Sequence, residues 1–347
     1  MKKIMLDYTL VEIRGLLADL PAFRSKQLYK WLNLDAEYST MSNIALDLRA
    51  KLADEYIARP AQIVDVLTAK DGTRKYLFRL SDGNIVEGVS MVYEHGTTLC
   101  LSTQVGCRMG CAFCASGRDG LVRNMSSGEM LGEVIAVNKY LGGTCDGRAV
   151  TNLVLMGMGE PLDNYDHVLK FIRTVSAPES LNIGQRNISL STCGLVPEIL
   201  RLAEEGLGVN LTISLHATTD VTRRKNMPVA KTYSIDRLIS AAKYYFDKTG
   251  RRVIYEYVLL KGENMSPADA ANLARITRGY PSHVNLIMLN ASGALKNTAC
   301  TPAEARAFFC ALAEAGVSVT IRRSVGAEIE GACGQLRRKF VGDLTAT

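Results

Sequence analysis

The chain has 347 residues, of which 47% are hydrophobic and 22% charged, and its formal net charge is +6 at pH 7. This composition is typical of a globular domain and excludes a disordered tail protein, a coiled coil and a collagen-like chain. No run of 18 apolar residues occurs and an acid at position 7 interrupts any signal-peptide core, so we expect a cytoplasmic protein without a membrane span. The mild positive charge permits an anionic partner such as nucleic acid.

The first 80 residues differ in pattern from the rest of the chain. Apolar side chains recur every four residues over 44–56, which indicates an amphipathic helix. Two alternating segments, 76–80 and 85–89, flank an Asp-Gly pair and predict two strands joined by a tight turn. We therefore expect residues 1–80 to form a helical accessory module with a hairpin, and 81–347 to form the main domain.

From about residue 97, predicted strands alternate with predicted helices. The helix expected at 126–140 opens with Ser126-x-x-Glu129, a capping-box pattern. This alternation predicts a parallel sheet with right-handed crossovers, and six or seven such units would close fully or partly into a barrel. A doubly wound open sheet is the alternative, because strand order cannot be read from one sequence. The expected strands are 98–102, 152–156, 187–191, 209–214, 253–259, 284–289 and 317–321.

Cys107, Cys111 and Cys114 follow the first of these strands with the spacing C-x3-C-x2-C. Thiolates select zinc or iron–sulfur centres. A structural zinc ion normally takes four ligands, whereas three cysteines leave one iron of a four-iron cluster open to substrate or cofactor. The loop position favours a functional centre, because ligands gather at the carboxyl ends of barrel strands. A structural zinc site completed by Cys100 or a more distant cysteine is the alternative.

The cysteine loop, with Phe113 before its last cysteine, resembles that of the radical S-adenosylmethionine (SAM) superfamily. The segment 157–161, which reads Gly-Met-Gly-Glu-Pro, is similar to the superfamily's GGEP-type motif, which holds the amino group of SAM. Taken alone, the segment would be an ordinary strand-to-helix turn. The resemblance implies an α/β fold with a partial parallel (β/α)6 barrel, and a [4Fe-4S] cluster and SAM as cofactors.

Further motifs resemble the RlmN/Cfr family, whose members are radical SAM enzymes that methylate an adenine of the large-subunit ribosomal RNA. The similarity extends from about residue 23 to residue 336. The segments that carry it are 100–107, 157–162, 191–194, 214–216 and 331–336.

The family resemblance implies a role for each matching residue. The three loop cysteines would hold the cluster. Cys333 would accept a methyl group from one of two SAM molecules used per turnover, Cys100 would later attack the Cys333 sulfur, and Glu87 would accept a proton. The implied SAM-binding residues are Gly159, Glu160, Ser191, Ser214, Leu215, His216 and Asn290.

The need for two cysteines also follows from the chemistry of adenine. Carbons 2 and 8 are not nucleophilic, so ordinary methyl transfer to them fails. A methyl group carried on a thiolate can be activated when the cluster cleaves a second SAM to a 5′-deoxyadenosyl radical, and it then adds to the ring. A second thiolate releases the adduct by forming a transient disulfide, and a base removes the ring proton. Without the resemblance, a cysteine at position 100 would be taken as a small core residue.

The resemblance also bears on the substrate. Val105 is typical of the branch that methylates carbon 2 of adenine in 23S ribosomal RNA, for which transfer RNA is a further candidate. The Cfr-type alternative is methylation of carbon 8, which gives ribosomal antibiotic resistance. Turnover would need an electron donor such as flavodoxin or ferredoxin. Basic runs at 223–225, 251–252, 322–323 and 337–339, and the basic residues Arg24, Lys26 and Lys30, are candidates for RNA contact.

Two other classes of protein stay open on the sequence. A radical SAM enzyme acting on a small molecule or peptide would not need Cys100 and Cys333. A non-catalytic RNA-binding module with a structural zinc ion would be colourless and would not cleave SAM. Both would keep the barrel, because a fold alone does not settle function.

Overall fold

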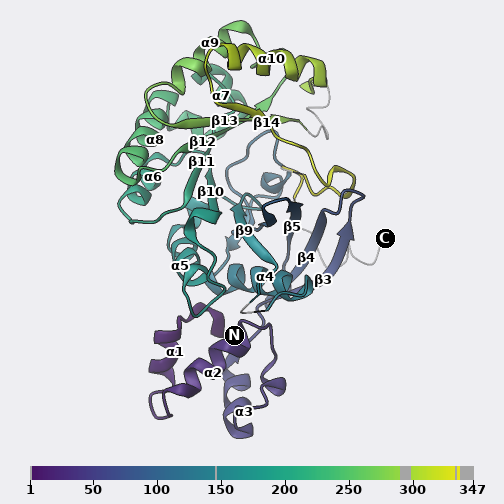
Figure 1. The fold of residues 1–347 in the computed structure, drawn as a ribbon, viewed down its shortest axis with the longest axis vertical. Helices are drawn as coiled ribbons and strands as arrows, with labels where there is room; N and C mark the ends of the chain where they lie inside the picture. Colours follow the sequence, from purple (N-terminus) through teal and green to yellow (C-terminus); the bar gives the residue numbers. More distant parts are fainter. Residues whose placement is uncertain (1, 145–146, 290–297, 333, 337–347) are drawn as a thin grey trace.

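The computed structural model describes residues 2–144, 147–289, 298–332 and 334–336. Its main element is a ten-stranded sheet (Figure 1). The strands are β3 (Ala61–Thr68), β4 (Arg74–Leu80), β5 (Ile85–Tyr93), β6 (Gly96–Cys100), β9 (Val150–Leu155), β10 (Ile188–Thr192), β11 (Asn210–Ser214), β12 (Val253–Leu259), β13 (Ser282–Met288) and β14 (Val319–Ile321). Two small sheets pair β1 (Lys3–Ile4) with β2 (Tyr56–Ile57), and β7 (Gln104–Gly106) with β8 (Leu121–Asn124).

Ten α-helices occur in the described part of the chain. The helices of the N-terminal segment lie together at one end of the molecule, and others line the outside of the curved sheet (Figure 1). The helices are α1 (Leu10–Leu16), α2 (Phe23–Leu32), α3 (Leu46–Glu55), α4 (Ser127–Tyr140), α5 (Tyr165–Ser176), α6 (Val196–Ala203), α7 (Asp220–Asn226), α8 (Ile235–Thr249), α9 (Pro267–Ile276) and α10 (Pro302–Glu314). Across the described residues, no helix combines the length and apolar character needed to cross a membrane.

The strand order of the large sheet is β14-β13-β12-β11-β10-β9-β6-β5-β4-β3. The seven strands from β6 to β14 pair in parallel in the order of the chain, and β5, β4 and β3 add an antiparallel extension. A doubly wound sheet would reverse its strand order at a switch point, so that alternative is wrong. Among the described strands, β14 and β3 are the two ends of the sheet, which makes it a partial barrel. The predicted α/β class is confirmed.

Several local predictions are confirmed in detail. All seven expected parallel strands are present, and the two alternating segments form the hairpin β4–β5 with Gly83 at φ +85° in its turn. Ser126 and Glu129 form the predicted capping box at the start of α4. The helix expected over 44–56 is shorter, because Tyr56 leaves α3 to pair with β1. The predicted division at residue 80 falls inside the hairpin turn, and it stays a prediction.

Helix α4 joins the N-terminal segment to the large sheet, and its residues are buried from Ser127 to Asn138. Asp7 Oδ1 accepts hydrogen bonds from the Gly128 backbone N–H at 2.6 Å and from Ser127 Oγ at 3.0 Å. A carboxylate at a helix N-terminus also interacts favourably with the helix dipole. A Cβ on Gly128 would lie 2.6 Å from the Asp7 backbone nitrogen, so the close approach requires glycine.

We expect Gly128→Ala to destabilise the protein by about 1–3 kcal/mol, because the added methyl group forces the two backbones apart. Urea unfolding of the anaerobic protein measures this loss. Gly15→Ala is the matched control: Gly15 also lies in a helix, but a Cβ there meets nothing within 4 Å. The control should be neutral or slightly stabilising. Equal stability of the two variants would contradict the tight docking of the N-terminal segment on α4.

Candidate functional site

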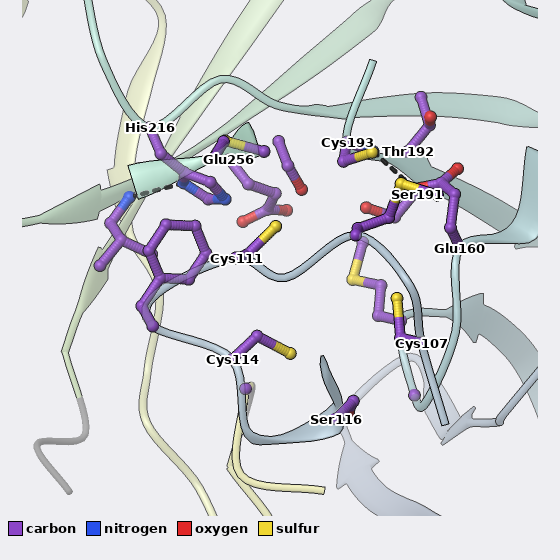
Figure 2. A pocket seen from close by; sticks show the side chains of 18 of the residues that line it. Cys107, Cys111, Cys114, Ser116, Glu160, Ser191, Thr192, Cys193, His216 and Glu256 are labelled. Carbon is purple, nitrogen blue, oxygen red and sulfur yellow. Dashed lines mark hydrogen bonds between the residues drawn. The ribbon is translucent and has the colours of Figure 1, made fainter. Parts of the chain in front are cut away.

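The carboxyl ends of consecutive parallel strands surround one cavity of about 140 Å³. Because these strand ends meet at the same rim, segments far apart in the sequence face each other there. The predicted cluster and SAM residues that line the cavity are Cys107, Cys111, Cys114, Gly159, Glu160, Ser191, Ser214 and His216. Figure 2 shows the three cysteines around a common space, with Glu160 and Ser191 on one side and His216 on the other.

The cysteine loop is held in place by backbone hydrogen bonds to three separate segments. The Cys107 N–H donates to Gly120 O at 3.0 Å, and the Ala112 N–H donates to Asn226 O, at the end of α7, at 2.9 Å. On the far side, the Ala115 N–H donates to Gly334 O at 2.8 Å. These contacts fix the position of the loop.

The loop has the donor set that an iron–sulfur cluster requires. Burial raises the pKa of the Cys107 thiol to about 12, and burial together with the neighbouring acidic groups raises the pKa of Cys111. Thiolates at these positions would therefore need a positive centre beside them. No three His, Cys, Asp or Glu side chains in the described ranges are grouped to hold a single metal ion. A four-iron cluster is larger than one ion, and three thiols lining a common cavity fit it.

The Gly-Met-Gly-Glu segment packs tightly on the segment that follows β6. A Cβ on Gly157 would lie 2.6 Å from Leu101 O, and a Cβ on Gly159, which has φ +104°, would lie 2.7 Å from Gln104 Cβ. Next along the chain, the Glu160 carboxylate accepts from the Leu162 N–H at 3.1 Å and from the Cys193 N–H at 2.7 Å. Burial raises the pKa of Glu160 despite these bonds. The acid is thus oriented at the cavity wall by the backbone of two loops.

His216 closes the opposite side of the cavity. It has φ +54°, a conformation that residues other than glycine rarely adopt and that clusters at functional sites. Its Nδ1 accepts from the Val258 N–H at 3.0 Å, so the neutral ring carries its proton on Nε2. The ring packs edge-to-face on Phe113 at a centroid distance of 4.6 Å. Burial lowers the pKa of His216 to about 3.

Cys100 lies in a second pocket that adjoins the main cavity. Met156, Ile287, Met288 and Leu336 line both spaces, so the two share a wall. Cys100 is half-buried at the end of β6 and does not line the main cavity.

Two predicted residues, Cys333 and Asn290, lie outside the described residues. The neighbours of Cys333 are described: Ala332 lines the second pocket, and Gly334 lines the main cavity. Described residues on the two sides of position 333 therefore line different pockets.

Glu87 is fully buried on β5 and lines neither pocket. Its carboxylate Oε1 lies 3.2 Å from Lys75 Nζ on β4. Its backbone carbonyl accepts from Ser102 Oγ, which in turn accepts from the Met158 N–H. Ser102 thus connects the Glu87 backbone to the Gly157–Glu160 segment, which lines the main cavity.

Three sequence-based assignments need correction or addition. Leu215 is fully buried and, unlike its neighbours Ser214 and His216, does not line the cavity; its carbonyl accepts from Arg223 Nε. Arg223 was expected to contact RNA, but it is fully buried and also donates to Cys193 O and Ser214 O. Cys193, to which no role was assigned from the sequence, lines the cavity, and its backbone N–H orients Glu160. Cys193 lies between Thr192 and Gly194 in a segment that resembles the RlmN/Cfr family, and this position was the sequence signal for a place at the cavity.

Comparisons with known proteins agree with this geometry. Residues 101–274 match the radical SAM superfamily. The crystal structure of a radical SAM methyltransferase from Sphaerobacter thermophilus superposes with a TM-score of 0.91 at 41% identity, covering 96% of this chain and 99% of that one. A probable dual-specificity RNA methyltransferase RlmN from Clostridium botulinum (strain Alaska E43 / Type E3) is 44% identical over 343 residues, 98% of this chain and 97% of the relative. A relative of the same name from Lachnoclostridium phytofermentans is 48% identical over 321 residues, 92% of this chain and 89% of the relative.

The fold and the cysteine loop define a radical SAM protein. Proteins of this class use a [4Fe-4S] cluster and SAM, as the family resemblance of the sequence implied. Identities of 44% and 48% over nearly the whole chain assign it to one family within this class: the chain belongs to the RlmN family. Members of this family use two SAM molecules per turnover.

The low pKa of His216 predicts a pH dependence of stability. The unfolded chain binds a proton at this histidine below pH 6.5, and the folded chain does not until about pH 3. Stability is therefore lost as the pH falls below 6.5, by up to about 1.4 kcal/mol per pH unit. We expect His216→Gln to remove this part of the slope between pH 6.5 and 5, measured by urea unfolding of the anaerobic protein. His95→Gln, at an exposed histidine, is the control, and identical slopes for wild type and His216→Gln would contradict the prediction.

Proposed function

We propose that this chain is a radical SAM RNA methyltransferase that methylates carbon 2 of an adenine in 23S ribosomal RNA, in the cytoplasm. The observation that carries the proposal is Cys100 in a pocket adjoining the cavity of the cysteine loop. A radical SAM enzyme acting on a small molecule or peptide has no need of this second thiol. The names of the full-length relatives, which describe RNA methylation, support the same conclusion.

In this proposal Cys107, Cys111 and Cys114 hold the cluster. SAM lies against Gly159, Glu160, Ser191, Ser214 and His216, with Leu215 supplying its backbone and Asn290 completing the site. When bound, the cluster and SAM supply the one-electron chemistry that activates an otherwise inert methyl group. The chain itself orients the Glu160 carboxylate, presents the Nε2–H of neutral His216, and uses Phe113 to keep water from the cavity.

Cys333 would carry the methyl group as a thioether and become bonded to the adenine through that carbon. Before the ring proton leaves, the radical adduct must also lose one electron, which the cluster would accept. The Cys100 thiolate then attacks the Cys333 sulfur. A sulfur–sulfur bond forms, the sulfur–carbon bond breaks, and the carbon keeps the bonding electron pair and takes up a proton to become the methyl group. Two electrons from a donor such as flavodoxin or ferredoxin return the disulfide to two thiols. Glu87 accepts the proton that leaves carbon 2 of the ring.

RNA would approach the rim where the C-terminal segment meets the cysteine loop. The target base must leave its stack to reach the second pocket. Arg24, Lys26 and Lys30 on α2 are candidates for phosphate contacts at a distance from the site. The relatives are named for dual specificity, and transfer RNA is the second substrate that we propose.

The first experiment combines metal analysis with product analysis. Anaerobically purified protein should contain about four irons per chain, with matching sulfide and a brown colour. Ribosomal RNA treated with the protein, SAM and a reductant should yield 2-methyladenosine on digestion. Isolation of 8-methyladenosine would instead assign the Cfr-type activity. A colourless protein that holds zinc and refuses iron would overturn the proposal and favour an RNA-binding module.

Variants that lack one of the two catalytic cysteines should stop the reaction at different steps. Cys333→Ala removes the methyl carrier, so it should give no methylated RNA and no covalent complex. Cys100→Ala should form the protein–RNA adduct and be unable to release it, so a covalent complex should accumulate on denaturing gels. The control is Cys310→Ala, because Cys310 on α10 lines neither pocket and its loss should leave methylation unchanged. Full activity of Cys100→Ala would contradict the two-cysteine mechanism.

A further inference from the structure

Lys75 is a buried cation that no sequence motif singled out. Its side chain is 1% exposed, and the Glu87 side chain beside it is fully buried, with Nζ and Oε1 3.2 Å apart. Lysine is almost never this deeply buried unless it is paired. An ion pair at such a site is costly to desolvate, so its presence requires an explanation beyond stability.

The strand registers place this pair on the same face of the sheet as Cys100. Lys75 on β4 is directly opposite Val89 on β5, and Val89 is directly opposite Cys100 on β6. Residues directly opposite each other in an antiparallel pair project to the same face, and Glu87 joins them because it is two residues from Val89. Val89 and Cys100 both line the second pocket. The backbones of Lys75 and Cys100 are therefore about two strand spacings, roughly 10 Å, apart, and the side chains of Lys75, Glu87 and Cys100 leave the same face of the sheet.

Lys75 has a second contact, with the segment that carries Cys333. Its Nζ donates to the backbone carbonyl of Glu330 at 3.3 Å. The same segment is also attached to the turn between β3 and β4, where the Lys70 N–H donates to Glu328 Oε1 at 2.6 Å and the Gly326 N–H donates to Asp71 Oδ2 at 3.2 Å. Lys75 thus links the buried acid to the C-terminal segment.

A carboxyl group buried alone takes up a proton and can no longer act as a base. A lysine cation at 3.2 Å favours the ionised form and fixes the direction of the carboxylate. We propose that Lys75 is a positioning residue for the RNA reaction, which keeps Glu87 ionised and oriented to accept the proton from carbon 2 of the bound adenine. This inference rests on the proposed function. In the step, the C–H bond breaks, its electron pair returns to the ring, and an O–H bond forms on Glu87, while Lys75 keeps its own protons.

The test compares Lys75→Met, Glu87→Gln and the double variant with wild type in the full-length, cluster-loaded protein. Methylation of Cys333 is measured by intact mass, and release of methylated RNA from the covalent adduct is measured in a single turnover. We expect Glu87→Gln to slow release by about 100-fold or more, and Lys75→Met to slow it at least tenfold. Because Lys75 acts through Glu87, the double variant should match Glu87→Gln within about twofold. All three should methylate Cys333 at near the wild-type rate.

Glu328→Ala is the matched control for a purely mechanical role. It removes a contact between the C-terminal segment and the turn between β3 and β4 but leaves Lys75 and Glu87 in contact. It should leave release of the adduct within about twofold of wild type, and Lys75→Arg, which keeps the charge, should restore most of the release rate. If Lys75→Met and Glu328→Ala instead lower Cys333 methylation equally and leave release unchanged, Lys75 is only a tether and the inference is overturned.

Two further outcomes separate this inference from the proposed function. Absence of Cys333 methylation in the wild-type protein would overturn the proposed function and the inference with it. Normal turnover by wild type and by Lys75→Met would overturn the inference alone. If Lys75→Met fails to fold because it leaves an acid buried without its partner, the double variant has no such unpaired charge. Release by the double variant much slower than by Glu87→Gln would then contradict the proposal.

Discussion

The site depends on the parallel pairing of strands in chain order, from β6 through β9, β10, β11, β12 and β13. Each strand enters the sheet beside the one before it, so all of their carboxyl ends open at one rim. The cysteine loop follows β6 by way of β7, the Gly157–Glu160 turn follows β9, and Ser191 and Ser214 close β10 and β11. A reversal anywhere in this order would send one of these segments to the other side of the sheet.

Buried polar groups keep these strand-end loops at fixed distances. Arg223 donates to carbonyls in the loops after β10 and β11, and Glu160 accepts from the backbone after β9 and β10. Each such bond replaces hydration that burial removed, and a lost partner would leave a buried polar group unpaired. The rim is therefore organised by side chains that span neighbouring loops. This explains why an arginine from a basic run is used inside the protein instead of on its surface.

The sequence predicted those parts of the structure that depend on local pattern. Alternation and turn residues predicted the hairpin and all seven parallel strands, and the spacing of Cys107, Cys111 and Cys114 predicted a common centre. It could not predict that Lys75 would meet Glu87, since that contact depends on the register between β4 and β5 and on the depth at which the hairpin is buried. The burial of Arg223 was missed for the same reason: a run of basic residues looks like a solvated face until tertiary packing is known.

The two adjoining pockets suit the proposed reaction, in which the Cys333 sulfur first carries a methyl group and is later attacked by the Cys100 thiolate. The main cavity has the soft ligands and the oriented acid that a cluster and SAM require, while the second pocket has Cys100. The buried pair of Lys75 and Glu87 lies on the same face of the sheet as Cys100. Ala332 and Gly334 of the C-terminal segment line different pockets, so described residues of this segment reach both spaces. The antiparallel extension of the barrel is thus more than a cover for its edge, because it contacts the C-terminal segment through Lys70, Asp71 and Lys75. In the proposed mechanism it would also supply the base, Glu87.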